Sequence, residues 1–157
     1  IMCGICGFYS NTNSLYNDAI SKMSFAISHR GPDESGSWID KRSGIVMGHQ
    51  RLSILDLSLA GNQPMSSNSD RYVITYNGEV YNHLDIRKEL KNSNSNIKWK
   101  GNSDTETLLE AIEFWGFKNT LKKIEGMFAF ALWDKKTRSL NLATSVAIVT
   151  SRIISQL

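Results

Sequence analysis

Residues 126–134 read Gly126-Met127-Phe128-Ala129-Phe130-Ala131-Leu132-Trp133-Asp134, an apolar run rich in aromatic residues. Residues 127–133 of this run are typical of a β-strand. The polar residues 134–138 follow it, and a second strand-like run covers residues 139–143. Two such runs joined by a short polar turn predict an antiparallel pair. Clusters of β-branched and aromatic residues predict further strands at residues 5–9, 36–40, 44–49 and 72–76.

Helical patterns separate these strands. Residues 15–27 are predicted to form a helix with Ser14 as its N-cap. Its apolar face is expected to consist of Leu15, Ala19, Met23 and Ile27.

The clearest helical pattern covers residues 104–115, with Asp104 as the N-cap and Glu106 in the first turn. Its apolar face is formed by Leu108, Leu109, Ile112 and Trp115. Asn82 is expected to begin a shorter helix that runs to about residue 90, before a surface loop at residues 92–96. The pattern of elements therefore predicts an α+β fold with mostly antiparallel pairing.

The composition limits the class of protein. At 157 residues the chain fits one domain, and its net charge of +3, with scattered Lys and Arg, does not favour nucleic-acid binding. No apolar stretch approaches the ~20 residues of a membrane-spanning helix, and the start lacks the layout of a signal peptide. Two cysteines cannot form a disulfide framework. We therefore expect a cytoplasmic protein with neither a nucleic acid nor a membrane as partner.

Cys3 follows Met2, and removal of an initiator Met would leave Cys3 as the first residue. A terminal cysteine carries a nucleophilic thiol and an α-amine, which has a lower unperturbed pKa than a lysine and can act as its base. The same amine can then pass the proton to a leaving group. The alternative is that Cys3 is a small buried apolar residue, as most free cysteines are.

Cys3 and Cys6 form a C-x-x-C pair, for which a redox or zinc site is the alternative interpretation. A redox pair would need a helix N-terminus close behind it, whereas a strand-like run follows here. In a strand, residues three apart point to opposite faces. The three histidines of the chain do not have the usual spacing of zinc ligands. We therefore expect no metal site and assign Cys6 to packing.

Six motifs occur in a fixed order along the chain. They are His29-Arg30-Gly31-Pro32-Asp33, Gly48-His49-Gln50-Arg51-Leu52-Ser53-Ile54, Gly61-Asn62-Gln63-Pro64-Met65, Tyr76-Asn77-Gly78-Glu79-Val80-Tyr81-Asn82, Ser103-Asp104-Thr105-Glu106 and residues 126–134. Together they closely resemble the glutaminase domain of glutamine-hydrolysing asparagine synthetases. These domains are class II glutamine amidotransferases, which belong to the N-terminal-nucleophile hydrolases. The resemblance assigns residues 1–143 to this domain and leaves residues 144–157 as an atypical tail.

The resemblance implies a four-layer αββα sandwich, in which two antiparallel sheets lie between helices. It implies Cys3 as the nucleophile and Asn77 and Gly78 as the oxyanion hole, one donating from its side chain and the other from its backbone. Taken alone, Asn77-Gly78 is a strong hairpin-turn signal, which is the alternative interpretation.

The resemblance also implies that Arg51 binds the α-carboxylate of glutamine, while Asp104 and Glu79 take its α-ammonium. A further segment, Leu52, Ser53, Ile54 and Leu55, is expected to line the pocket. The loop at residues 29–33 is expected beside the nucleophile, with Arg30 nearest the substrate. The alternatives are a surface position for Arg51 and a purely capping role for Asp104.

Three features depart from the family pattern. Ile1 precedes Met2. If both stay attached, the nitrogen of Cys3 is an amide and cannot act as a base, and their removal is left open. The tail reads Thr144-Ser145-Val146-Ala147-Ile148-Val149, where asparagine synthetases continue with Arg-Asp-Arg-Phe-Gly, and we interpret it as a truncation or frameshift. The Ser-Gly-Gly-x-Asp-Ser loop of the ATP-dependent synthetase domain is absent from this sequence.

The predicted function is hydrolysis of glutamine to glutamate and ammonia through a cysteine thioester, without a cofactor. ATP and Mg²⁺ are expected only for the missing synthetase domain, which is the expected partner. The alternatives are the same domain serving an amino-sugar or purine pathway, or a domain that binds glutamine without turnover. The oligomeric state is left open, with a homodimer as one alternative.

Overall fold

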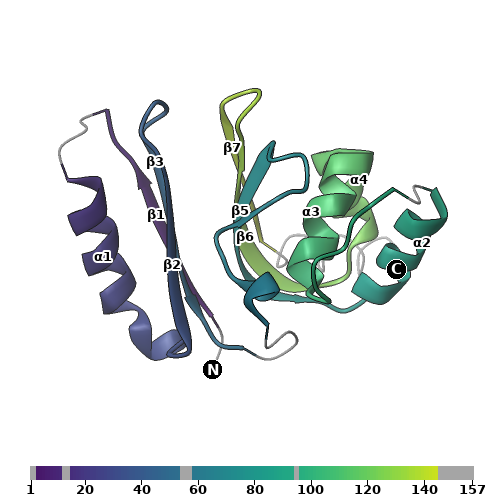
Figure 1. Ribbon diagram of the computed structural model, residues 1–157, viewed down its shortest axis with the longest axis horizontal. Coiled ribbons are helices and arrows are strands. Elements are labelled where there is room, and N and C mark those ends of the chain that lie inside the picture. Colours follow the sequence, from purple (N-terminus) through teal and green to yellow (C-terminus); the bar gives the residue numbers. More distant parts are fainter. Residues whose placement is uncertain (1–2, 12–14, 54–57, 94–95, 145–157) are drawn as a thin grey trace, which may run out of the picture.

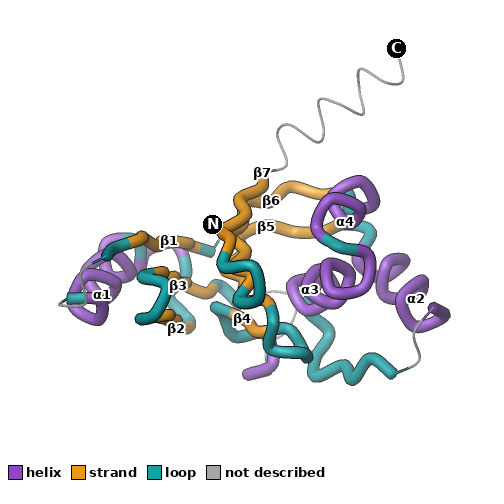
Figure 2. The backbone as a smooth tube through the Cα atoms, turned by 90° about the horizontal axis from the view of Figure 1, so that it is seen from above, coloured by secondary structure: helices purple, strands orange, loops and turns teal. Residues whose placement is uncertain are grey.

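A computed structural model describes residues 3–11, 15–53, 58–93 and 96–144. These residues form four layers, in which two β-sheets face one another and helices cover their outer faces (Figure 1). Seen from above, the two sheets lie side by side, with α1 on one flank and α2, α3 and α4 on the other (Figure 2). The predicted αββα arrangement is confirmed.

The first sheet contains three antiparallel strands in the order β1-β3-β2. They are β1 (Gly4–Tyr9), β2 (Glu34–Asp40) and β3 (Ile45–Arg51). All seven residues of β3, the central strand, are buried. It is also longer than the predicted residues 44–49, and the extension brings Arg51 into the sheet.

The second sheet contains four antiparallel strands in the order β4-β5-β6-β7. They are β4 (Met65–Ser66), β5 (Tyr72–Val80), β6 (Gly126–Asp134) and β7 (Ser139–Thr144). The predicted hairpin of β6 and β7 is confirmed to within about a residue at each end. By contrast, β5 runs four residues beyond the predicted end at Tyr76.

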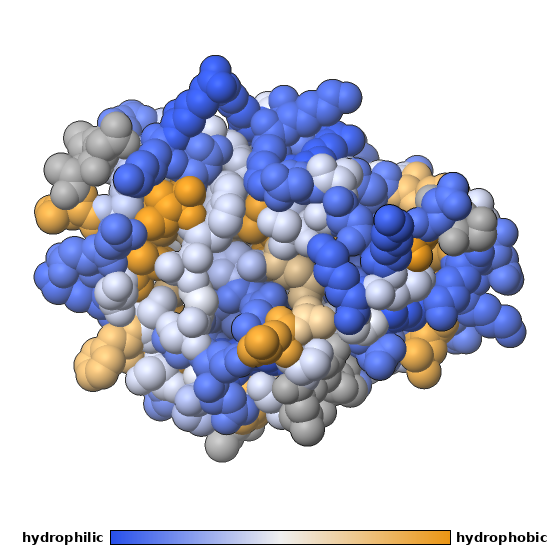
Figure 3. Space-filling view, viewed as in Figure 1, coloured by the Kyte–Doolittle hydropathy of each residue, from blue (hydrophilic) through white to orange (hydrophobic). Residues whose placement is uncertain are grey.

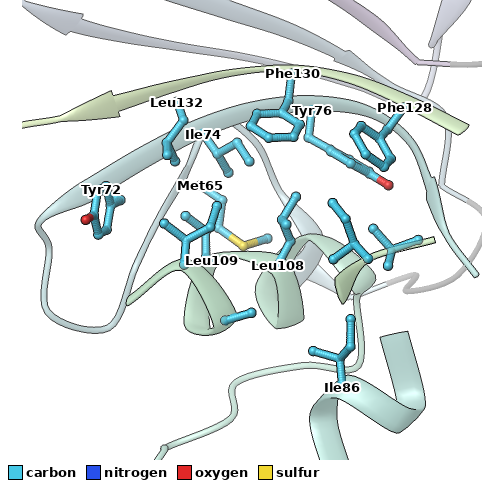
Figure 4. Close-up of a cluster of buried hydrophobic side chains, with 14 of the residues drawn as sticks. Met65, Tyr72, Ile74, Tyr76, Ile86, Leu108, Leu109, Phe128, Phe130 and Leu132 are labelled. Atoms are coloured by element: carbon cyan, nitrogen blue, oxygen red, sulfur yellow. The ribbon is translucent and has the colours of Figure 1, made fainter. Parts of the chain in front are cut away.

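Alternating side chains give each sheet two apolar faces. Between the sheets, Ile45 and Met47 of the first pack with Val73 and Trp133 of the second. On the outer face of the first sheet, Val46 packs against α1. On the outer face of the second, the largest buried cluster joins β5 and β6 to the helices (Figure 4).

Between β1 and β2 the chain forms helix α1 (Tyr16–Ala26) and a short 3₁₀ turn, η1 (Ser28–Arg30). A second 3₁₀ turn, η2 (Leu59–Gly61), lies between β3 and β4. The predicted face of α1 was wrong by one position. Tyr16, Ile20 and Ser24 are the buried residues, whereas Leu15 is exposed. The aromatic ring of Tyr16 packs against Phe8 of β1, so the helix directs Tyr16 and the residues one and two turns after it toward the first sheet. The predicted cap, Ser14, lies outside the described residues.

The second helical layer contains α2 (His83–Ser93), α3 (Asp104–Trp115) and α4 (Phe117–Lys123). Helix α3 has the predicted bounds and buries the predicted Leu108, Leu109 and Ile112. Helix α2 continues beyond residue 90, so residues 92 and 93 are helical rather than part of a loop. Helix α4 was not predicted, because it has only seven residues, of which Phe117 and Leu121 pack partly buried against the core.

The surface is consistent with a protein that keeps its apolar residues inside. Figure 3 shows a predominantly hydrophilic face, on which hydrophobic residues form small separate groups. No helix within the described residues is long and apolar enough to cross a membrane.

Candidate active site

Cys3 lies directly before β1, against the end of β3. Its Sγ accepts a hydrogen bond from the Leu52 backbone N–H at 3.3 Å and lies 3.6 Å from the Leu52 carbonyl oxygen. Cys6 points to the opposite face, where its Sγ lies 3.6 Å from Ser24 Oγ beneath α1. Both thiols are free. The two cysteines therefore belong to different environments, and Cys6 packs as predicted.

Arg51 lies in the first sheet, in register with the nucleophile. Gly4, the first residue of β1, pairs with Gln50, so Cys3 directly before it is level with Arg51, which pairs with Glu34 of β2. By strand alternation Arg51 faces the second sheet, as Met47 does.

The guanidinium of Arg51 is fixed by neighbours. It is 6% exposed, and its Nη1 donates to Glu34 Oε2 at 2.5 Å, Asn62 Oδ1 at 2.5 Å and the Ser58 carbonyl at 3.2 Å. Charge-assisted bonds of this kind give a guanidinium a defined direction. The alternative of a surface arginine is therefore wrong.

Asn77 and Gly78 lie inside β5, where they pair with Ala129 and Phe128 of β6. They do not form a turn, so the hairpin alternative is wrong. Asn77 shares a face of β5 with Thr75, whose Oγ1 donates to the Gly48 carbonyl of the first sheet at 3.1 Å. The side chain of Asn77 therefore faces the sheet that carries Cys3 and Arg51. Its Oδ1 is buried and has no hydrogen-bond partner among the described residues.

Gly78 occupies a backbone position that excludes a side chain. Its φ is +149°, a region that other residues rarely adopt. A Cβ at this position would overlap the Met127 carbonyl oxygen and would lie 2.6 Å from the Cβ of Phe128. Glycine is therefore required for β5 to approach β6 this closely.

Asp104 joins helix α3 to strand β5. Its Oδ2 accepts hydrogen bonds from the Tyr76 hydroxyl and the Val80 N–H, each at 2.9 Å, and its Oδ1 accepts from the Thr105 N–H at 2.9 Å. The carboxylate thus reaches the segment that contains Asn77, Gly78 and Glu79. Glu79, the residue before Val80, is exposed.

The predicted N-cap was wrong. Ser103 caps α3, because its Oγ accepts a hydrogen bond from the Glu106 N–H at 3.1 Å. Asp104 is the first helical residue, and its carboxylate is directed to the sheet instead.

The predicted loop at residues 29–33 does lie beside Cys3. Arg30 Nε donates to the Cys3 carbonyl at 3.2 Å, and Asp33 Oδ2 accepts from the Ser53 N–H at 2.7 Å. Leu52 and Ser53 therefore lie next to the nucleophile. Ile54 and Leu55 lie outside the described residues.

Three residues that sequence reasoning did not single out connect these parts. His49 Nε2 lies 3.0 Å from the Tyr76 carbonyl oxygen, and Gln63 Oε1 accepts from the Tyr76 N–H at 2.6 Å. Burial, with a smaller effect from nearby Arg51, lowers the pKa of His49 to about 4, against the opposing hydrogen bond to Tyr76. His49 is therefore neutral at pH 7 and donates its proton to that carbonyl. The only sequence signal for Gln63 and Tyr76 was their place inside two motifs.

The described residues contain no group of three or more His, Cys, Asp or Glu side chains arranged to hold a metal ion. The segments described above instead carry a guanidinium, carboxylates, an amide and backbone N–H groups. Such a set can bind a small zwitterion and stabilise negative charge that develops beside the thiol.

The comparison with known proteins gives the family of this domain. Residues 2–145 match the family model described as a glutamine amidotransferase domain. The chain belongs to the glutamine amidotransferase family. This assignment agrees with the resemblance that the motifs indicated, and it covers every site residue described above.

Relatives of this glutamine amidotransferase domain include much longer proteins. One from Mycobacterium tuberculosis, provisionally named a glutamine-hydrolysing asparagine synthetase, is 39% identical over 153 residues, 88% of this chain and 23% of the relative. Bacillus subtilis asparagine synthetase (glutamine-hydrolysing) 3 is 37% identical over 143 residues, 88% of this chain and 22% of the relative. Amidase chry2 of Gibberella zeae is 33% identical over 150 residues, 88% of this chain and 22% of the relative. The chain thus spans less than a quarter of these relatives.

Proposed function

We propose that this domain hydrolyses the side-chain amide of glutamine to glutamate and ammonia. The observation that carries the proposal is the position of the Cys3 sulfur. The Leu52 N–H, directly after Arg51 at the end of β3, donates to it, and β3 belongs to the sheet that faces the Asn77 side of β5. A thiol, a carboxylate-binding guanidinium and an oxyanion-binding segment are the parts that this reaction requires.

In the proposed reaction the α-amine of Cys3 takes the thiol proton, and the sulfur attacks the amide carbon. The side-chain amide of Asn77 and the N–H of Gly78 stabilise the oxyanion. The amine then gives its proton to the departing ammonia, which leaves a thioester. Water hydrolyses the thioester, releases glutamate and restores the thiol. These steps use groups of the chain itself and need no metal or nucleotide.

The two charged ends of glutamine would be bound by separate groups. Arg51 is proposed to bind the α-carboxylate, since Glu34 and Asn62 already fix the direction of its guanidinium. Asp104 and Glu79 are proposed to bind the α-ammonium. Leu52, whose N–H donates to the sulfur, supports negative charge at the nucleophile.

The test compares ammonia and glutamate release by three proteins that begin at residue 3. One has the natural sequence from Cys3 onward, and the others carry Cys3→Ser and Cys3→Ala. We expect turnover only by the natural protein, because neither variant has a comparable nucleophile. A protein that retains Ile1 and Met2 serves as a second comparison, because its thiol is present while its α-amine is acylated. Undiminished hydrolysis by Cys3→Ala, with contaminating amidases excluded, would contradict the proposed function.

We further propose that the ammonia passes to a synthetase domain, which would use ATP and Mg²⁺ to convert aspartate to asparagine. The names of the bacterial relatives support this acceptor. A second candidate is another amide-forming or amide-cleaving system, supported by the relative named an amidase. Formation of asparagine from glutamine, ATP and aspartate by the whole protein distinguishes them. The free thiols fit a reducing cytoplasm as the location.

A further inference from the structure

Tyr76, the residue directly before Asn77, is held at three separate points. Its backbone N–H donates to Gln63 Oε1 at 2.6 Å, its carbonyl oxygen accepts from His49 Nε2 at 3.0 Å, and its hydroxyl donates to Asp104 Oδ2 at 2.9 Å. The three partners come from a loop, from β3 and from α3. Tyr76, which directly precedes Asn77 and Gly78, is therefore held by side chains from three distant parts of the chain, two through its backbone and one through its hydroxyl.

Each partner of Tyr76 also belongs to a segment that holds a charged substrate-binding group. His49 lies two residues before Arg51 on β3. Gln63 follows Asn62, whose Oδ1 accepts a hydrogen bond from Arg51. The Nε2 of Gln63 lies 3.4 Å from the Oγ1 of Thr105, the residue next to Asp104. The contacts of Tyr76 thus connect the proposed carboxylate-binding and ammonium-binding groups to the proposed oxyanion hole.

The hydroxyl of Tyr76 is well suited to hold Asp104. Its ring is 2% exposed and packs against both Phe128 and Phe130, with centroid separations of 6.4 Å from each (Figure 4). Burial, followed by the negative charge of Asp104 and the hydrogen bond to it, raises the pKa of Tyr76 well above its ordinary value. The phenol therefore stays protonated at every pH at which the domain would work, and it remains a donor to the carboxylate.

We propose that Tyr76 is a positioning residue that makes hydrolysis depend on the α-ammonium group of the substrate. An ammonium bound at Asp104 fixes that carboxylate, and the phenol transmits its position to the backbone that carries Asn77 and Gly78. An amide without an α-ammonium group leaves this connection unused. Tyr76 would thereby select α-amino acid amides over similar amides that have only a carboxylate. This inference rests on the proposed function and extends it to substrate selection.

The test uses glutamine and glutaramate, which is glutamine without its α-ammonium group. For each protein, kcat and KM are measured with both amides, and the selectivity is the ratio of the two kcat/KM values. Tyr76→Phe removes one oxygen and retains the packed ring. We expect it to lower the selectivity by about tenfold to a hundredfold, the effect of losing a hydrogen bond to a charged group. We also expect kcat for glutamine to fall, while the values for glutaramate change little.

Tyr72→Phe is the matched control. Tyr72 is also buried, lies on the same face of β5 and belongs to the same apolar cluster, but it is the first residue of the strand, well before Asn77. The control should retain the selectivity of the natural protein. An effect of Tyr76 on stability alone would lower turnover of both amides equally and leave the selectivity unchanged. An unchanged selectivity would overturn the inference, and so would a higher KM for glutamine with an unchanged kcat.

Gln63→Met provides a second variant if Tyr76→Phe does not fold. It removes the acceptor for the Tyr76 N–H while retaining the length of the side chain. The selectivity should again fall, and an unchanged selectivity would overturn the inference. The natural protein separates the two levels of the proposal. If it hydrolyses neither amide, the proposed function fails; if it hydrolyses glutamine but Tyr76→Phe keeps its selectivity, only the role of Tyr76 fails.

Discussion

Replacement of Gly78 by alanine should destabilise the domain more than the same change at Gly116 or Gly126. Two separate effects act at Gly78. Its φ of +149° disfavours any side chain, which costs about 1–2 kcal/mol. In addition, the new Cβ would lie 2.6 Å from Phe128 Cβ and overlap backbone atoms of β6, whereas apolar carbons pack at about 3.5–4.0 Å. Overpacking of this kind typically costs about 1–3 kcal/mol.

The sum is about 2–5 kcal/mol of unfolding free energy for Gly78→Ala, a large part of the stability of an ordinary domain. Two other glycines separate the effects. Gly116 has a φ of +81° but no atom within 4 Å of an added Cβ, so Gly116→Ala should cost only about 1 kcal/mol. Gly126 lacks the unusual φ, but a Cβ there would lie 3.0 Å from Val80 Cα and overlap the Glu79 carbonyl. The loss of unfolding free energy for Gly126→Ala should therefore lie between those for Gly116→Ala and Gly78→Ala.

Urea unfolding, followed by circular dichroism, measures how far each of the three glycine-to-alanine changes lowers the unfolding free energy. With an m-value of about 2 kcal/mol per M, Gly78→Ala should lower the midpoint by about 1–2.5 M. Gly116→Ala should lower it by about 0.5 M. Glutamine turnover by Gly78→Ala should also be lost, because the displaced strand moves the proposed oxyanion donor. Equal destabilisation at Gly78 and Gly116 would refute the argument that contact with β6 makes Gly78 necessary.

Three further predictions concern binding, chemistry and pH. Arg51→Ala should raise KM for glutamine by about tenfold to a hundredfold, measured by initial rates, and an unchanged KM would place the carboxylate elsewhere. Asn77→Ala should lower kcat more than it raises KM, because an oxyanion exists only during the reaction; the reverse would argue against its role. Burial alone would raise the pKa of Asp134, but the hydrogen bonds from Arg71, at 2.7 Å and 3.1 Å, and from nearby N–H groups together outweigh it and lower this pKa to about 2. Its stabilising effect is therefore present above the unfolded pKa of about 3.9 and lost as pH falls toward 2, so Asp134→Asn should destabilise at pH 7 and weaken the acid dependence of unfolding between those values.

Much of the fold was predictable because local patterns carried it. The β6–β7 hairpin and helix α3 were predicted to within about a residue, since each has a strong apolar periodicity of its own. Helix α4 was not predicted, because in a seven-residue segment two apolar residues, Phe117 and Leu121, are too few to define a helical period. The face of α1 was one position wrong, because packing of Tyr16 on Phe8 decides it and the pattern within the helix does not.

The residues of the candidate site were predictable from the sequence, whereas their contacts were not. Cys3, Arg51, Asn77, Gly78 and Asp104 were all named from motifs, because their chemical types and order are visible along the chain. Their roles remain proposals.

The sequence by itself determined the family, the four-layer class and the candidate reactive groups, because these depend on side-chain chemistry and on order along one chain. Only the tertiary structure decided that Asn77-Gly78 is a strand rather than a turn, because pairing with β6 outweighs the local preference of that dipeptide. Only the tertiary structure placed Tyr76 between His49, Gln63 and Asp104, partners 13 to 28 residues away in sequence. Hydrogen bonds between such distant segments exist only after the sheets and helices pack, so no local pattern contains them.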